Sequence, residues 1–415
     1  MAHFDILTLI MAGGKGERLS LLTQNRAKPA VRFGAQYRII DFTLSNCVNS
    51  NLRNIFVLTQ YKSLSLERHI KEGWSFFDRR MNEYIDVIPP QQRIGTDWYR
   101  GTADAIYQNF YSIDQLRPRD LLILSGDHIY KMDYRQMIQA HQSTGADVTI
   151  ATFPVHASEA SLFGILVTDN EQRVTGFQEK PQSGPATIKD RPRECLANMG
   201  VYIFRTETLR RWLEDDTRNP GSAHDFGRDI LPAMVESGER VMAYRFVDVN
   251  AKDEPYWRDV GEIEAYYAAN MDLVQVEPIF NLYDPTWPIY TYNPQAPAPK
   301  FVFAQEYPGG RCGRALDSIV ANGCIISGGL VQRSLLSQMV RINSFVHVKQ
   351  SLLFDQVEVG RNCSIRRAIV DTRAKIPEGT EIGYDYEADK ARFSVTPIEN
   401  DQWLTIVMRE AAAKL

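Results

Sequence analysis

The chain has 415 residues, of which 44% are hydrophobic and 24% charged. This length predicts two or three domains, and the apolar content excludes a disordered chain. The 47 basic and 51 acidic residues give a formal charge of −4, so no overall positive field favours nucleic acid or an anionic membrane. The first apolar run is too short for a membrane span and lacks a basic leader. The five cysteines form no CxxC pair, which predicts mostly buried thiols in a reducing cytoplasm.

Short β-branched runs alternate with helical patterns from residue 5 to about 275. Their lack of strict polar alternation predicts an α/β fold with a mainly parallel sheet covered on both faces. The predicted strands are residues 5–12, 54–59, 121–125, 148–152, 201–204 and 241–246. A helix is predicted from Thr102 to Leu116, capped by Thr102, because Ile106, Phe110 and Ile113 share one face.

Six prolines interrupt residues 278–299 and predict an extended linker. Beyond it, apolar residues recur mostly six positions apart, which predicts a parallel β-helix with these side chains inward; a β-sandwich is the alternative. They are Ile319, Ile325, Val331, Leu335, Val340, Val346, Leu352, Val357, Cys363, Ile369, Ile376 and Ile382. Residues 403–415 are predicted to form a closing helix. The predicted domains are residues 1–277 and 301–415, joined by a linker at 278–300.

A glycine-rich turn, Gly13-Gly14-Lys15-Gly16, follows the first strand and leads to Arg18. Glycines allow close backbone approach to a phosphate, and a helix N-terminus presents free N–H groups to it. The turn matches neither a Walker loop nor a dinucleotide fingerprint. Residues 1–40 hold six Lys or Arg against two acids, the later cations being Arg26, Lys28, Arg32 and Arg38. The pattern favours phosphate binding; the alternatives are a structural turn and a solvated charged face.

Two acids are candidate metal ligands. Asp127 follows the strand at 121–125, at the sheet edge where open α/β folds bind ligands. Asp259 lies in the segment WRDVG. Two carboxylates from distant segments can hold divalent metal for phosphoryl-type transfer, although each could equally be a turn residue. Glu179-Lys180 offers an acceptor and a cation for a sugar phosphate, with a surface turn as the alternative. His128 has no evident Ser or Cys partner, which favours a structural role.

The segments GGKGERL, RAKPAV, RIIDFTLSN, WYRGTADA, SGDHIY, EKP, NMGVY and WRDVG occur together, ahead of the hexapeptide region. In this combination the chain resembles the sugar-phosphate nucleotidyltransferases over nearly its whole length, and among them the glucose-1-phosphate adenylyltransferase family. The resemblance implies a Rossmann-like nucleotidyltransferase domain followed by a left-handed parallel β-helix. It also implies a Mg²⁺-dependent reaction in which ATP and glucose 1-phosphate give ADP-glucose and pyrophosphate.

The resemblance also implies roles for individual residues. Arg18, Lys15 and Asp127 would be catalytic, and Asp127 and Asp259 would hold the metal ion. ATP would contact Gly13, Gly14, Gly16, Lys28, Gln60 and Gly101. The sugar phosphate would contact Tyr99, Gly164, Glu179, Lys180 and Asn198, the last of which stands in place of a common Ser.

Members of the resembled family are homotetramers controlled by phosphorylated metabolites, which implies an allosteric anion site; Arg26, Arg38 and Arg366 are the candidates. Asn25 stands where enterobacterial members have an activator-binding Lys, so a fructose 1,6-bisphosphate response is not implied. Three alternatives remain: a sibling transferase that uses another nucleoside triphosphate, an acyltransferase with His347 as general base, and a regulatory subunit without turnover.

Overall fold

The computed structural model describes residues 5–14, 16–90, 98–250, 255–398 and 402–414. They form two compact units. Unit 1 comprises residues 1–14, 43–126 and 131–255, and unit 2 comprises residues 15–42, 127–130 and 256–415. Because each unit collects distant segments, this division differs from the predicted boundaries at residues 277 and 300, which remain a prediction.

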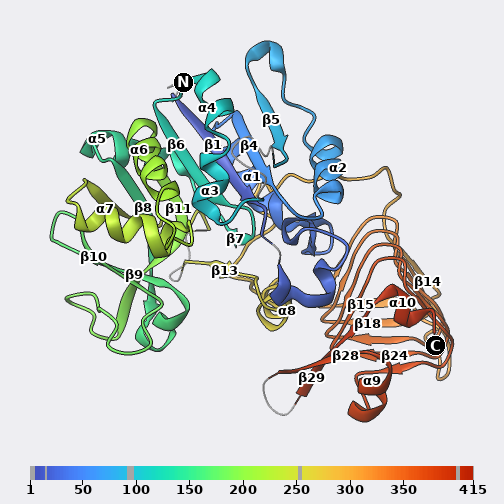
Figure 1. The fold of residues 1–415 in the computed structure, drawn as a ribbon. Helices are drawn as coiled ribbons and strands as arrows, with labels where there is room; N and C mark the ends of the chain where they lie inside the picture. Colours follow the sequence, from blue (N-terminus) through green and yellow to red (C-terminus); the bar gives the residue numbers. More distant parts are fainter. Residues whose placement is uncertain (1–4, 15, 91–97, 251–254, 399–401, 415) are drawn as a thin grey trace. The chain divides into compact units, whose positions relative to one another are not determined.

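Unit 1 is built on one nine-stranded sheet (Figure 1). Four neighbouring strands are parallel: β6 (Asp120–Ser125), β1 (Ile6–Ala12), β4 (Asn54–Thr59) and β5 (Tyr84–Ile88). The long strand β11 (Glu194–Arg205) pairs antiparallel with β6, β8 (Val148–His156) and β9 (Gly164–Thr168). The outer strands are β10 (Val174–Glu179) and β12 (Val241–Arg245).

The central strands are buried almost throughout their length. This confirms the expectation from unbroken apolar runs, because a strand covered on both faces has no polar side. All six predicted strands are present. The helices of the sheet region are α1 (Ile39–Asn49, which spans the division between the units), α2 (Leu64–Gly73), α3 (Thr102–Tyr107), α4 (Phe110–Leu116), α5 (Tyr134–Thr144), α6 (Thr206–Thr217) and α7 (Leu231–Glu236). Over the described ranges, no helix combines the length and the apolar character that crossing a bilayer requires.

The predicted helix from Thr102 to Leu116 is instead two helices. Helix α3 ends before Asn109, whose buried side chain donates to the carbonyl of Ala105 at 2.7 Å. Gly101 is the N-cap of α3, and no side chain caps it, so the prediction that Thr102 is the cap was wrong. The predicted apolar face is correct, since Ile106, Phe110 and Ile113 are all buried.

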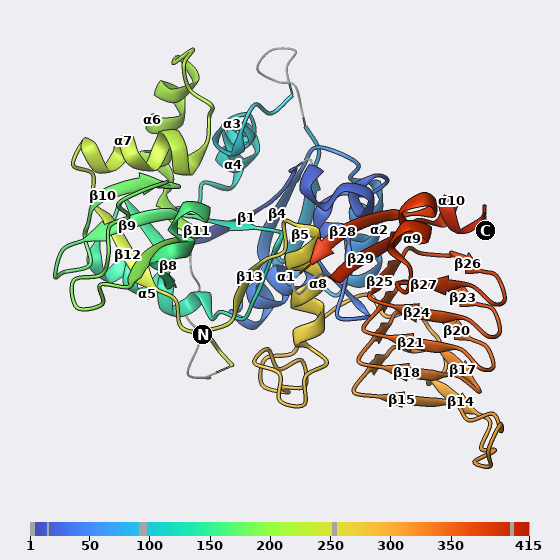
Figure 2. The same cartoon turned by 90° about the horizontal axis from the view of Figure 1, so that it is seen from below.

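Unit 2 contains a parallel β-helix of the hexapeptide type, which confirms the predicted repeat (Figure 2). Its three sheets are β14-β17-β20-β23-β26, β15-β18-β21-β24-β27 and β16-β19-β22-β25-β29-β28. The strand bounds, from β14 to β27, are Lys300–Val302, Arg314–Leu316, Ile319–Val320, Ile325–Ser327, Leu330–Gln332, Leu335–Leu336, Arg341–Ile342, His347–Lys349, Leu352–Leu353, Glu358–Val359, Ser364–Arg366, Ala368–Val370, Lys375–Ile376 and Glu381–Ile382. The described residues 278–299 contain neither helix nor strand, as the prolines predict.

Five of the twelve residues predicted to point into the β-helix lie outside its interior core, Ile319 and Ile325 among them. Leu335, Leu352 and Ile369 belong to a separate core with Val31 and Tyr266, while the interior is filled by the residues that follow them, Leu336, Leu353 and Val370. The helix α8 (Ile263–Asp272) and residues 19–42 supply much of this outer core. One sheet of the β-helix is therefore apolar on both faces, and a six-residue period cannot distinguish them.

The predicted closing helix at 403–415 was also wrong over most of its length. Residues Gln402–Val407 form strand β29, which continues the third sheet in parallel with β25 and pairs antiparallel with β28 (Ser394–Ile398). Leu404 and Ile406 enter the outer core, while Val407 enters the interior. This alternation has the period of a strand. The helices here are the short α9 (Tyr386–Arg392) and α10 (Arg409–Ala412).

Candidate active site

A two-stranded ribbon in unit 2 brings the two predicted metal ligands together. Strands β7 (His128–Tyr130) and β13 (Trp257–Asp259) pair antiparallel, with His128 opposite Asp259 and Tyr130 opposite Trp257. Asp127 immediately precedes His128, so both carboxylates lie at the same end of the ribbon. The sequence predicted each acid separately, and the pairing of β7 with β13 makes them neighbours.

The ammonium group of Lys28 lies between these carboxylates. Its Nζ donates to Oδ2 of Asp127 at 2.7 Å and to Oδ1 of Asp259 at 3.1 Å. Lys28 begins the 3-10 helix η2 (Lys28–Ala30), and only 6% of it is exposed. Burial lowers the pKa of Lys28, but the two carboxylates together outweigh this effect, so the pKa is raised overall. The ammonium group therefore stays positively charged and offsets part of the negative charge of the acid pair.

His128 belongs to the same cluster. Ligand atoms of Asp127, His128 and Asp259 lie within 4.8 Å of one another, and Nε2 of His128 is 3.5 Å from Oδ1 of Asp127. Its ring packs edge-on against Trp257 at 4.7 Å, and its Nδ1 is buried with no hydrogen-bond partner in the described part of the chain. Carboxylate oxygens suit hard divalent cations, and an imidazole nitrogen is a further possible ligand. The donor set thus fits a divalent metal, and sequence reasoning missed the position of His128.

The glycine turn continues into unit 2 at Gly16, the N-cap of the 3-10 helix η1 (Glu17–Thr23). Gly16 has φ of +64°, and a Cβ there would lie 3.0 Å from Cγ2 of Thr23, so a side chain would be strained in both respects. The hydroxyl of Thr23 donates to the Gly16 carbonyl at 2.8 Å. The predicted catalytic residue Lys15 lies outside the described residues.

Arg18 is exposed beside the acid pair. Its guanidinium forms an ion pair with Glu262 at 3.4 Å, where both side chains are well solvated. A Cβ on Gly261 would lie 3.0 Å from Oδ1 of Asp259 and 3.2 Å from Nη2 of Arg18. The absence of a side chain at Gly261 therefore lets Arg18 approach Asp259. A solvated guanidinium next to a cluster of metal-type ligands can bind phosphate oxygens.

Several of the predicted ATP contacts meet at the ends of β1 and β4 in unit 1. A Cβ on Gly13 would lie 3.1 Å from Cβ of Gln60, and Gln60 donates to the carbonyl of Tyr99 at 3.0 Å. Gly101 packs so tightly that a Cβ there would lie 2.3 Å from the carbonyl oxygen of His224. Gly14 has open space around it. The structure thus brings Gly13, Gln60 and the Tyr99–Gly101 segment together.

Glu179 is held between two glycines. A Cβ on either Gly164 or Gly227 would lie 3.0 Å from Oε2 of Glu179; Gly164 is also its strand partner, since β9 pairs with β10. Burial raises the pKa of Glu179, the neighbouring Lys180 partly opposes this, and Asp225 adds to the rise. Nζ of Lys180 is 4.0 Å from Oε1 of Glu179 and solvated. A carboxylate with an adjacent free ammonium suits a sugar hydroxyl and a phosphate.

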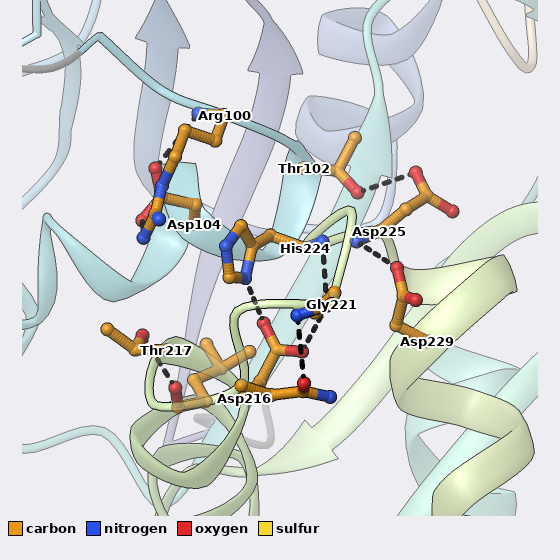
Figure 3. A network of polar contacts seen from close by, with 12 residues as sticks. Arg100, Thr102, Asp104, Asp216, Thr217, Gly221, His224, Asp225 and Asp229 are labelled. Carbon is orange, nitrogen blue, oxygen red and sulfur yellow. Dashed lines mark hydrogen bonds and ion pairs between the residues drawn. The ribbon is translucent and has the colours of Figure 1, made fainter.

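Asn198 and two residues that sequence reasoning missed, Tyr202 and Asp225, belong to the surroundings of Glu179. Asn198 donates to the hydroxyl of Tyr202 at 2.8 Å. Burial raises the pKa of Tyr202, and the carboxylates of Asp225 and Glu179 contribute in the same direction, so the phenol stays protonated at neutral pH. Asp225 accepts from Thr102 at 3.2 Å (Figure 3). A signal was present in the sequence as the FG pair Phe226-Gly227, which directly follows Asp225.

Tyr99 is engaged within the protein. Its hydroxyl accepts from Nδ2 of Asn109 at 2.8 Å, and the side chain is buried. Burial raises the pKa of this phenol, and the hydrogen bond from Asn109 partly opposes the rise. Its predicted contact with a sugar stays a prediction, since the observed role is to support the segment that Gln60 holds.

The three predicted effector-binding cations are only partly brought together. Arg26 pairs with Asp371 at 2.8 Å. Burial, together with the nearby Arg32 and Arg26, lowers the pKa of Arg38 to about 10. Arg366 instead donates to the carbonyl of Gly383 and stacks on Tyr384. Arg26 and Arg38 therefore form a half-buried group, and Arg366 belongs to a corner of the β-helix.

A cavity of about 1020 Å³ lies next to Arg26 in the same unit. Gln24 and Asn25 line it on one side, and residues from α9, β29 and α10 on the other. Its lining includes two cations, Arg392 and Lys414, and one acid, Glu410. The cavity can receive a small polar anion, and hexapeptide periodicity gave no sign of it.

Residues 7–276 match the family model described as "Nucleotidyl transferase", and residues 297–399 match "GlmU-like, C-terminal hexapeptide". The chain is 52% identical over 408 residues to a protein of Koribacter versatilis named glucose-1-phosphate adenylyltransferase, covering 98% of this chain and 96% of that one. Proteins of the same name from Rhodopirellula baltica and Methylococcus capsulatus are 52% and 50% identical over 97% and 94% of this chain, and 90% and 91% of theirs.

Proposed function

The chain belongs to the nucleotidyl transferase family, among the glucose-1-phosphate adenylyltransferases, and we propose that Asp127, Asp259 and Lys28 form the charge centre of its active site. The protein transfers the adenylyl group of ATP to glucose 1-phosphate, giving ADP-glucose and pyrophosphate. The observation that carries the proposal is the convergence of two carboxylates from distant segments on one ammonium.

The reaction requires charge neutralisation more than covalent catalysis. A phosphate oxygen of glucose 1-phosphate attacks the α-phosphorus of ATP, and the bond to pyrophosphate breaks in line. Arg18, solvated beside Asp259, stabilises the negative charge of the departing pyrophosphate. The backbone of Gly13, Gly14 and Gly16 leaves room for the triphosphate to approach closely.

Asp127 and Asp259 would hold the divalent metal ion, for which we propose Mg²⁺ because hard carboxylate oxygens favour it. When bound, Mg²⁺ supplies charge stabilisation at the phosphate oxygens. Lys28 would give up these carboxylates to the metal ion and bond the nucleotide phosphates instead.

Glu179 and Lys180 recognise the sugar phosphate, the carboxylate accepting from hydroxyls and the ammonium binding the phosphate. Tyr202 and Asp225 extend this site, since each interacts electrostatically with Glu179, and Asn198 joins it through its hydrogen bond to Tyr202. Gln60 and Gly101 serve the base, supported by the contact between Gln60 and Tyr99.

Further properties belong to the proposal. A phosphorylated effector binds at the cavity lined by Asn25, Arg392 and Lys414, near Arg26 and Arg38. Exposed apolar side chains in the first coils, Phe301, Leu316 and Phe345, support self-association, for which we propose a homotetramer. A cytoplasmic location fits five free thiols, four of them buried.

The test is the formation of pyrophosphate and ADP-glucose by purified protein with Mg²⁺, ATP and glucose 1-phosphate. Asp127→Asn is expected to fold normally and to lower turnover by about 10²- to 10³-fold, the scale for a preorganised electrostatic group. Asp215→Asn, a change to a well-exposed carboxylate, is the matched control. Near-normal turnover in Asp127→Asn would contradict the assignment. Offering four nucleoside triphosphates in competition tests the preference for ATP.

A further inference from the structure

A buried His–carboxylate pair in unit 1 plays no part in the chemistry above. Nδ1 of His224 lies 2.6 Å from Oδ2 of Asp216, and both side chains are almost fully buried. The other oxygen of Asp216 accepts from Ser222 at 2.6 Å, and the backbone N–H of His224 donates to the same hydroxyl at 2.9 Å. Figure 3 shows the pair beside Asp225 and Thr102.

Two local features of this pair are unfavourable in free energy. His224 has φ of +56°, a left-handed conformation that costs a non-glycine residue free energy. Asp216 lies in the last turn of α6, where the negative end of the helix dipole disfavours a carboxylate. Strained backbone conformations and unfavourably placed charges in a folded protein concentrate at sites where function requires a residue to be held in position.

The backbone at His224 contacts segments that belong to two proposed substrate sites. The carbonyl of His224 accepts from the N–H of Ala103, in the first turn of α3, at 2.9 Å. The same carbonyl oxygen lies only 2.3 Å from where a Cβ on Gly101 would be, so the segment proposed to face the base packs directly against His224.

The next residue, Asp225, serves the sugar side. Its carboxylate accepts from the N–H groups of Gly227 and Arg228 and from the hydroxyl of Thr102. It also acts on Glu179 electrostatically. Displacing His224 would therefore move Asp225 and the Gly101 segment together.

We propose that His224 and Asp216 are positioning residues that hold Asp225 in register with Glu179 and set the base-facing segment at the same time. The inference rests on the proposed function, because it assigns the pair a role at those two sites. His224 and Asp216 touch no substrate in this scheme. They act through the backbone at 224 and 225.

The experiment compares steady-state constants of the full-length chain and the variants His224→Asn and Asp216→Asn. Asparagine tolerates positive φ, so His224→Asn removes the ring with little added backbone strain. The expected result is a rise in KM for glucose 1-phosphate of about 10- to 100-fold, the range for removing a group that orients a site, with kcat changed less than about threefold. His347→Asn, an exposed residue of β21, is the matched control.

A double-mutant cycle separates positioning from general destabilisation. If His224 acts through Asp225, His224→Asn combined with Asp225→Asn raises KM no further than Asp225→Asn alone. Multiplying effects, or an unchanged KM in folded single variants, would overturn the proposal. If His224→Asn does not fold, Asp216→Asn completes the same cycle. Failure of the wild-type chain to form ADP-glucose would contradict the proposed function instead, so the two failures are distinguishable.

Discussion

Replacing Lys28 with methionine should tighten metal binding by the nucleotide-free protein. The ammonium of Lys28 already bonds both carboxylates, at 2.7 and 3.1 Å, so a divalent cation must displace it. Methionine keeps much of the apolar volume and removes the charge. The same change is expected to weaken ATP binding, because the ammonium is then missing for the phosphates. An increase in metal affinity together with a decrease in ATP affinity is the result expected if Lys28 exchanges between the carboxylates and the phosphates.

The expected gain in metal affinity follows from the two charge-assisted hydrogen bonds of Lys28 that metal binding has to break. Hydrogen bonds to charged groups contribute about 1.5–3 kcal/mol each. Because the two carboxylates are partly solvated, at 29% and 37% side-chain exposure, water compensates for part of the loss. We therefore take the net gain as one such bond, about 1.5–3 kcal/mol, which corresponds to an affinity increase of about 10- to 150-fold.

The assay is Mn²⁺ binding to nucleotide-free protein, followed by the electron paramagnetic resonance signal of free Mn²⁺. Asp259→Asn should abolish the tight site, which verifies that the signal reports these carboxylates. Lys390→Met, a change on α9 where the ammonium packs over Tyr386 at 5.6 Å, is the matched control. Unchanged or weaker Mn²⁺ binding by a folded Lys28→Met protein would refute the reasoning.

Three further changes test other parts of the structure. Gly164→Ala would place a Cβ 2.6 Å from Cζ of Phe177 and 3.0 Å from Glu179, so KM for glucose 1-phosphate should rise about tenfold or more. An unaltered KM would show that the neighbouring side chains can move to accept the methyl group. Asp389→Ala removes the buried acceptor of four hydrogen bonds, including those of Trp403 and Arg392, and should cost about 3 kcal/mol or more in unfolding free energy, read from denaturant titrations. Burial, the largest cause, and the charge of Asp225 raise the pKa of Glu179 above 4.5, so the native state binds this proton more tightly than the unfolded state does. The free energy of unfolding should therefore fall as pH rises from the unfolded to the folded pKa. Glu179→Gln should flatten that slope, and an equal slope in the variant would contradict this prediction.

Several elements could be read from the sequence alone because one physical rule decides each of them. Strand β4 occupies the predicted residues Asn54–Thr59, since an unbroken β-branched run can only be a strand covered on both faces. The hexapeptide period specified a β-helix, because each short strand must place an apolar side chain inward. The acids Asp127 and Asp259 were found because each follows a recognisable segment.

Other features depended on contacts between segments far apart in the chain. The sequence around residue 403 does not indicate that this segment will pair with the edge of β25, so a helix was predicted where strand β29 forms. Leu335 and Leu352 fit the inward period but pack outward, because α8 covers that sheet.

The active centre shows the division most clearly. The sequence by itself determined which groups are present: a glycine turn, a cluster of cations and two acids of opposite charge to them. Only the tertiary structure decided that Lys28 takes both acids as partners and that His128 joins them. The physical reason is that charge neutralisation depends on distances of a few ångströms, and β-strand pairing, which no local pattern encodes, sets those distances.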